Sequence, residues 1–167
     1  LNLAFLATKI KYSLYYQIIT ILRKISIMFD VALANAGAQV VLATSSDEKH
    51  PPENMIDGQT ETFWTSTGMF PQEFIISFQQ LMNVNTIKMD TFNVKGLQLE
   101  RSVQNEPNDF QPLDEKDLVS TDGQLQHNEF SFSSTTAQHL RVVINSGHDH
   151  FISVHKLHVD GTAVHNS

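Results

Sequence analysis

The sequence predicts an all-β fold, an antiparallel two-sheet jelly-roll sandwich. Apolar and polar residues alternate over short stretches, and polar segments rich in turn-forming residues separate these stretches. The main part of the chain lacks the 3.6-residue apolar period of an amphipathic helix. At 167 residues, the chain is long enough for one domain with a buried core.

The first predicted strand spans residues 25–33, where apolar and polar positions alternate. Its apolar face consists of Ile25, Ile27, Phe29, Val31 and Leu33. Residues 34–38 predict a turn and residues 40–43 a short second strand. The polar segment 44–52 ends in two prolines, so we expect a loop there.

Alternation returns in several places after an irregular loop at residues 53–64. The apolar positions are Phe74, Ile76 and Phe78; Ile87 and Met89; Leu97 and Leu99; Phe130 and Phe132; Leu140, Val142 and Ile144; and Leu157 and Val159. The acidic stretch 105–117 contains two prolines and is predicted to be a long exposed loop. We therefore expect about eight short strands, with Leu140, Val142 and Ile144 facing the core.

Residues 1–22 differ in composition from the rest, being apolar, aromatic and basic. The uncharged run from Tyr12 to Leu22 is too short to span a bilayer, and Lys9 and Lys11 interrupt the apolar stretch. The lysines and the lack of a small-residue cleavage site also argue against a signal peptide. We assign residues 1–22 to an amino-terminal extension and residues 23–167 to the domain. An interfacial or docking helix is the alternative for the extension.

Charge is distributed unevenly along the chain. The formal net charge is −7, but residues 1–24 hold four basic residues and no acid. The remainder therefore carries 7 basic and 18 acidic residues, a formal charge of −11. Such a surface repels phosphate backbones, which argues against a nucleic-acid partner, and it attracts cations and basic protein patches. The chain contains no cysteine, which excludes disulfides and thiolate chemistry.

The loop at residues 54–64 carries the most informative chemistry. It places Asp57, Gly58, Glu61 and Thr62 within a tight stretch. Ca²⁺ takes about six to eight oxygen ligands at flexible geometry, and backbone carbonyls supply several of them. A carboxylate, a glycine and a threonine hydroxyl can therefore wrap this ion, although the spacing is not that of an EF-hand. A tight Asp-Gly turn without an ion is the alternative.

Residues 43–78 resemble the opening of a discoidin, or coagulation-factor C-type, domain, whose asparagine, aspartate–glycine, threonine and tryptophan pattern marks a structural calcium loop. The chain resembles still more closely the family of small galactose-binding-like subunits of intraflagellar transport complex B, also catalogued as heat shock protein beta 11. The stretches that carry this resemblance are TSTGMFPQEFIISF at residues 65–78, EKDLV at 115–119, GQLQ at 123–126 and DHFISVHKLHVDGT at 149–162. The resemblance covers residues 22–167 and implies a galactose-binding-like sandwich.

The resemblance also implies a structural Ca²⁺ ion and its ligands. From the loop these are the carbonyl of Asn54, the side chain of Asp57, the carbonyl of Gln59, and the carbonyl and hydroxyl of Thr62; from the last strand, the carbonyl of Val159 and the carboxylate of Asp160. Many family members have glutamate at the last of these positions. The shorter Asp160 side chain then needs a water to reach the ion.

Other residue patterns favour structural roles. His148, His150, His155 and His158 raise the possibility of zinc. His155 and His158 lie three apart in a predicted strand, however, so they point to opposite faces. Ser45, Asp47 and His50 are near neighbours in a polar loop and do not form a triad, and no phosphate-binding glycine loop is present. We expect Trp64 to lie in the core and the protein not to be an enzyme.

Two functions remain in view. The resemblance implies a non-enzymatic subunit of intraflagellar transport complex B that pairs with a Rab-like small GTPase. Such a subunit supports ciliary protein transport and signalling from the cytoplasm and the cilium. The alternative is a glycan- or lipid-binding discoidin module, whose loops are usually rich in arginine and exposed aromatics. The loops at 44–50 and 105–117 are acidic and hold one aromatic residue, Phe110, which favours the transport subunit.

Overall fold

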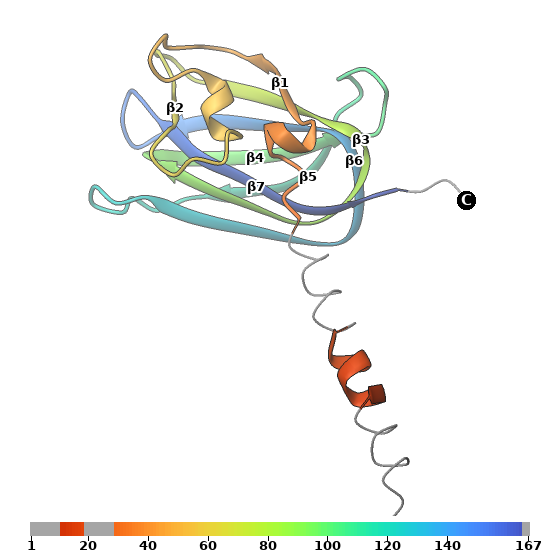
Figure 1. Ribbon diagram of the computed structural model, residues 1–167. Helices are drawn as coiled ribbons and strands as arrows, with labels where there is room; N and C mark the ends of the chain where they lie inside the picture. Colours follow the sequence, from red (N-terminus) through yellow and green to blue (C-terminus); the bar gives the residue numbers. More distant parts are fainter. Residues whose placement is uncertain (1–10, 19–28, 165–167) are drawn as a thin grey trace, which may run out of the picture.

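The computed structural model describes residues 11–18 and 29–164, and strands dominate it (Figure 1). The named elements are η1 (Ala34–Ala36), β1 (Gln39–Ala43), η2 (Pro52–Met55), β2 (Trp64–Thr65), β3 (Gln72–Phe92), β4 (Val94–Ser102), β5 (Gln111–Asp117), β6 (Gln126–Gly147) and β7 (Ser153–Ala163). Residues 11–18 form a helix whose side chains are exposed. Within the described residues, no helix is long and apolar enough to cross a membrane.

All strand pairs between these elements are antiparallel, in the order β2-β7-β3-β6-β4-β5 with β1 on β3. β3 pairs with β6 over two stretches, and the register shifts between Ser77 and Met82. The first stretch of β3 also pairs with β1, and the second pairs with β7. The two halves of β3 therefore belong to different layers of the molecule.

The all-β antiparallel prediction is confirmed, and the long strands add a detail that periodicity missed. The strands predicted around Phe74 and Ile87 are two halves of β3, and those around Phe130 and Leu140 are two halves of β6. The layers are consequently joined into one hydrogen-bonded network. An irregular register bends a strand locally, and this allows one strand to serve both layers.

The core lies between the two layers. Leu140, Val142 and Ile144 are fully buried, as predicted. Side chains of the second layer, such as Ile87 and Leu157, belong to the same buried cluster. Burial of this kind stabilises by about 25 cal/mol per Å² of apolar surface removed from water.

The predicted strand at residues 25–33 is wrong for its described part, residues 29–33. Only Asp30 makes an isolated bridge, to Asp160, and a turn follows. The reason is local, because the Asp30 carboxylate accepts the backbone N–H of Ala32 at 3.0 Å and so favours a turn over a ladder. Ile25 and Ile27 lie outside the described residues.

The predicted loop at residues 105–117 is wrong for its second half. Gln111–Asp117 form β5, which pairs with β4. Pro112 is tolerated because β5 is an edge strand, where a missing N–H leaves no ladder bond unmade. The acidic side chains of β5 point largely into solvent, and repulsion among such charges protects an edge from pairing with other chains.

A buried glutamine amide holds the turn between β3 and β4. The Gln126 Oε1 atom accepts the Val94 N–H at 3.0 Å, and its Nε2 donates to the Val94 carbonyl at 2.7 Å. Nε2 also donates to the Val119 carbonyl at 2.9 Å. The side chain thus replaces the backbone partner that Val94, a fully buried residue, would otherwise lack.

We predict that Gln126→Leu lowers the free energy of unfolding by about 2–4 kcal/mol, because two buried backbone groups of Val94 lose their partners. Urea denaturation followed by tryptophan fluorescence measures this change. Gln124→Leu is the matched control, since the Gln124 side chain is exposed, and it should change stability by less than about 0.5 kcal/mol. Equal effects of the two substitutions would contradict the structural role of the amide.

Candidate functional site

Four of the six predicted calcium ligands lie close together in the chain, Asn54 in η2 and the other three, Asp57, Gln59 and Thr62, in the loop between η2 and β2. The Asp57 carboxylate is the centre of this group, since its Oδ1 accepts the Gln59 N–H at 2.8 Å. Its Oδ2 accepts the Thr62 hydroxyl at 2.8 Å. Asn54 closes the loop by donating its Nδ2 to the Phe63 carbonyl at 3.0 Å. These bonds fold residues 54–63 into one turn, whose buried base includes Met55 and Ile56 and whose tip, residues 57–61, is exposed.

The other two predicted ligands, Val159 and Asp160, lie on β7 and already have partners. The Val159 carbonyl accepts the Val31 N–H at 3.0 Å. The Asp160 carboxylate contacts His158 Nε2 at 3.2 Å, and the other ring nitrogen of His158 lies 2.9 Å from Asp30. Asp30 is therefore part of this site, and sequence reasoning missed it because it occupied a polar position of the predicted strand at residues 25–33.

The segment from Asp30 to Ala34 links the loop to β7. Besides the bond from Val31 to β7, the Ala34 N–H donates to the Ile56 carbonyl at 2.9 Å. Gly58, at the tip of the loop, has a φ of +79°, a left-handed conformation that glycine adopts without strain. A Cβ there would lie 3.3 Å from a Leu33 methyl group. One short segment thus contacts both halves of the predicted ligand set.

The loop residues fit a hard cation in their donor chemistry. Asn54, Asp57, Gln59 and Thr62 offer only oxygen donors of the kind that Ca²⁺ prefers. On β7, Val159 and Asp160 would have to share their oxygens with their present partners. Within the described residues, no group of three or more histidine, aspartate or glutamate side chains is arranged to hold a metal ion. Backbone and hydroxyl oxygens would therefore have to supply most of any coordination shell.

Glu61 is a second carboxylate on the same loop. The Thr60 hydroxyl donates to its Oε1 at 2.6 Å, and this hydrogen bond lowers the pKa of the Glu61 carboxyl. The charge of Asp57 acts in the opposite direction, but it is a smaller effect. The loop therefore carries negative charge at neutral pH, which favours the approach of a cation.

Three stacked rings lie beside this loop. Phe63 stacks on His50 at 4.0 Å between ring centroids and on His155 at 4.7 Å. Burial lowers the pKa of His155, and the charge of Asp90 opposes that effect only in part. No sequence signal identifies this stack, because its members come from a loop, a loop end and a strand far apart in the chain.

The remaining histidines do not converge. His155 and His158 point to opposite faces of β7, as their spacing predicted, because His155 contacts Phe63 and His158 contacts Asp30. The His148 ring donates its Nε2–H to the Leu118 carbonyl at 2.8 Å. The zinc alternative therefore has no geometric support from His148, His155 and His158.

Ser45 and Trp64 have structural roles in the loop that follows β1. The Ser45 hydroxyl donates to Gln72 Oε1 at 2.7 Å, and its carbonyl accepts the Trp64 indole N–H at 3.0 Å. Trp64 is fully buried and packs edge to face against Phe74, which confirms the predicted core position. Asp47 caps the N–H groups of Lys49 and His50 with the same carboxylate oxygen.

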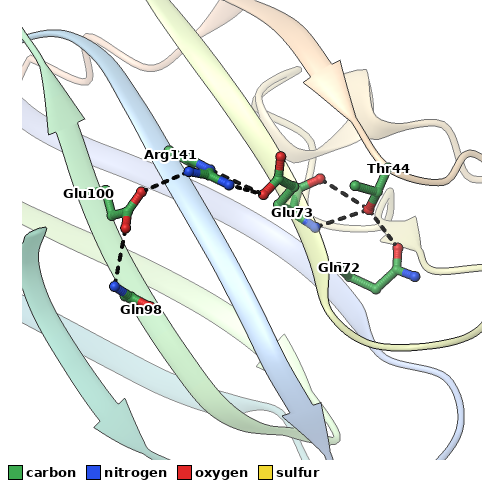
Figure 2. A network of polar contacts seen from close by, with 6 residues as sticks. All are labelled: Thr44, Gln72, Glu73, Gln98, Glu100 and Arg141. Atoms are coloured by element: carbon green, nitrogen blue, oxygen red, sulfur yellow. Dashed lines mark hydrogen bonds and ion pairs between the residues drawn. The ribbon is translucent and has the colours of Figure 1, made fainter. Parts of the chain in front are cut away.

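A second polar cluster ties three strands together (Figure 2). Arg141 on β6 pairs with Glu73 on β3 and with Glu100 on β4, the latter at 3.1 Å. The hydrogen bonds that Arg141 donates to the Glu73 carboxylate raise the pKa of the Arg141 guanidinium, and the two glutamate charges add to this effect. Thr44 extends the network by accepting the Glu73 N–H at 3.0 Å. The cluster is held by mutual pairing, so it supports the strands and presents no free group for chemistry.

Comparison with known proteins places these features in a family. The profile of the F5/8 type C domain matches residues 40–157. The human intraflagellar transport protein 25 homolog is 51% identical over 137 residues, which cover 82% of this chain and 95% of the human protein. Intraflagellar transport protein 25 of Chlamydomonas reinhardtii is 37% identical over 134 residues, covering 80% of this chain and 70% of that protein.

Solved structures with the same fold include carbohydrate-binding modules. A family 32 module from Clostridium perfringens, solved in complex with galactose, matches with a TM-score of 0.65 at 16% identity. The match covers 78% of this chain and 98% of the module. Another module from the same organism, in complex with a GalNAc-galactose disaccharide, gives 0.65 at 22% identity, with 76% of this chain and 97% of the module covered. These similarities establish the galactose-binding-like fold.

We predict that the stability of the protein falls as the pH drops below the ordinary histidine value of 6.5, partly through His155. Because its pKa is lower in the folded state, the unfolded chain binds more protons in this range, and stability rises with pH. Urea midpoints at about pH 7.5 and about pH 5.5 measure the effect. His155→Gln should reduce the pH-dependent loss, whereas His150→Gln, at an exposed position, should not. Identical pH dependence in wild type and His155→Gln would contradict this assignment.

Proposed function

The chain belongs to the F5/8 type C domain family and, within it, to the intraflagellar transport protein 25 homologues, and on this premise we propose that it is a subunit of intraflagellar transport complex B. The observation that carries the proposal is 51% identity extending over 95% of the human homolog. A match of that extent involves the whole domain rather than a shared motif. The names of the relatives support a location in the cilium, and we propose a cytoplasmic pool as well.

Within such a complex, the proposed role is to pair with a Rab-like small GTPase and to support ciliary protein transport and signalling without catalysis. The names of the relatives describe transport proteins, and the fold is one that carbohydrate-binding modules use for recognition. The Arg141 cluster and the Ser45 loop also support a binding role, since their polar atoms pair with one another. Recognition then depends on surfaces rather than on a reactive centre.

Glycan or lipid binding is the second candidate, and the galactose complex of a structural neighbour favours it. That similarity extends to the fold alone, at 16% identity. Sugar sites need aromatic and polar groups that converge in a pocket. The loop at residues 44–50 carries a half-buried Asp47 and an exposed Glu48, and its one ring, that of His50, is stacked on Phe63. The transport role therefore has the stronger support.

We predict that the protein and a Rab-like GTPase of the transport machinery, when co-expressed, elute as one complex in size-exclusion chromatography. A standing interface should bury on the order of 1,600 Å² or more, so the complex should persist at micromolar concentration and at moderate salt. A galactose affinity column is the parallel measurement. Separate elution of the two proteins, combined with retention of this chain on galactose, would reverse the order of the two candidates.

We also propose that the domain binds a structural Ca²⁺ ion. In this proposal Asn54, Asp57, Gln59 and Thr62 hold the ion from the loop, and Val159 and Asp160 hold it from β7. The support is that the Gln59 N–H and the Thr62 hydroxyl both donate to the Asp57 carboxylate, together with the negative charge of Glu61 on the same loop. With an ion bound, Asp57 and Thr62 would both coordinate it instead of hydrogen-bonding to each other. Because Val159 and Asp160 would coordinate the same ion, it would fix the loop against β7.

Calcium in excess should raise the melting temperature of the wild-type protein by several degrees. A ligand present at about 100 times its Kd stabilises the native state by about 2.7 kcal/mol, which corresponds to about 5–11 °C for a domain of this size. Asp57→Ala should lose most of this rise. Asp47→Ala is the matched control, because Asp47 also caps a turn but lies on another loop. Melting curves that coincide in calcium and in chelator would reject the ion.

A further inference from the structure

Three apolar side chains stand in solvent on loops at one end of the molecule. Met69 is 87% exposed, Val119 is 78% exposed and Phe151 is 56% exposed. Their loops, residues 66–71, 118–124 and 147–152, form what we call the loop-end surface. Two of these loops, 118–124 and 147–152, lie at the left-hand end of the molecule in Figure 1. Large apolar side chains exposed on neighbouring loops are typical of interaction sites.

The loops that carry Met69 and Phe151 are fastened to each other. The Ser66 N–H donates to the Ile152 carbonyl at 3.0 Å, and the Ile152 N–H donates to the Ser66 hydroxyl at 3.1 Å. Between the two loops the Phe70 ring packs on Gly147, where an added Cβ would lie 2.6 Å from the ring. Met69 and Phe151 are therefore presented by one rigid unit.

The loop that carries Val119 is fastened to the same unit. The His148 ring donates to the Leu118 carbonyl at 2.8 Å, and the Gln126 amide donates to the Val119 carbonyl at 2.9 Å. The backbone of all three loops is thus fixed by hydrogen bonds, while the side chains of Met69, Val119 and Phe151 are exposed to solvent. A surface ordered before binding loses little conformational entropy when a partner docks.

A pocket opens at the base of the loop-end surface. It has a volume of about 330 Å³ and is lined by Phe70 and residues 147–150. A pocket of this size accommodates one large side chain of a partner, which is how interface anchors are usually seated.

The charges around this surface favour a protein partner with a basic rim. Asp117, Asp122 and Asp149 lie on or beside the three loops, and the basic Lys95 lies on β4, where its carbonyl accepts the Leu118 N–H at 2.8 Å. An excess of negative charge opposes anionic lipid and nucleic acid and attracts lysine and arginine. Methionine and phenylalanine are also enriched at the centres of protein interfaces.

We propose that the loop-end surface is a docking surface for a protein partner that presents an apolar centre edged by basic residues. The inference rests on the proposed function, because it assigns this surface to the Rab-like GTPase of the pair. Met69, Val119 and Phe151 form the apolar contact, the pocket beside Phe70 receives an anchoring side chain, and the acidic groups orient the partner.

The test measures the affinity of the purified protein for the Rab-like GTPase by isothermal titration calorimetry. Met69→Ser combined with Phe151→Ser should weaken binding at least tenfold, and Val119→Ser should weaken it severalfold. Val103→Ser is the matched control, because Val103 is also exposed, at 45%, but follows the opposite end of β4. It should change the affinity less than twofold. All variants should keep the wild-type melting temperature, since the altered side chains are exposed.

The outcomes separate this inference from the proposed function. Wild-type binding that the Met69 and Phe151 substitutions leave intact overturns the docking surface and leaves the pairing in place. No binding by any form overturns both. Vesicles of phosphatidylcholine with phosphatidylserine and a galactose column serve as further arms. Retention of the wild type there, abolished by the Met69 and Phe151 substitutions, would show that the surface binds lipid or glycan and would reject a protein partner.

Discussion

The structure depends on the pairing of β3 with β6, which runs through both layers of the molecule. β1 and β7 attach to opposite halves of β3, and β4 attaches to the carboxyl-terminal half of β6. At the shift between Ser77 and Met82 the ladder is interrupted, and the Gln138 side chain satisfies the Phe78 carbonyl there at 2.8 Å. Because a buried carbonyl needs a partner, this bond makes the bend compatible with a closed core. The ends of these two strands then fix where the functional loops emerge.

Where the strand ladders end, side chains supply the hydrogen-bond partners of buried backbone groups. Gln126 pairs with both backbone groups of Val94, and Asp30 accepts the N–H groups of Ala32 and Val159. His139 on β6 likewise joins β3 to the loop after β4, because one ring nitrogen bonds to Ser77 and the other to the Asn105 carbonyl. In the described residues, no buried side-chain nitrogen or oxygen lacks a hydrogen-bond partner. Full satisfaction of buried polar groups gives the loops a defined conformation without regular structure.

Because the strands carry the stability, the loops at the ends of the β-sandwich are free to differ in their binding residues. The layers supply apolar burial, the Arg141 cluster ties three strands together, and the loops carry the exposed residues on which the proposed calcium and partner sites rest. A structural neighbour was solved in complex with galactose, whereas the loop-end surface of this chain has exposed apolar side chains and acidic neighbours. Loop chemistry on a constant scaffold therefore decides what is recognised, and fold similarity alone does not.

The sequence by itself determined the fold class, the buried faces of the strands and the oxygen-rich loop. Apolar alternation at Leu140, Val142 and Ile144 directly reflects which face leaves water, and the spacing of Asp57 and Thr62 is local enough to close a turn. Tertiary structure decided the rest. Asp30 turned an alternating segment into a bridge and a turn, β5 formed because β4 offered an open edge, and Phe63 met His50 and His155 across long sequence separations. These contacts depend on which strands lie side by side, and periodicity along one strand carries no information about its neighbours.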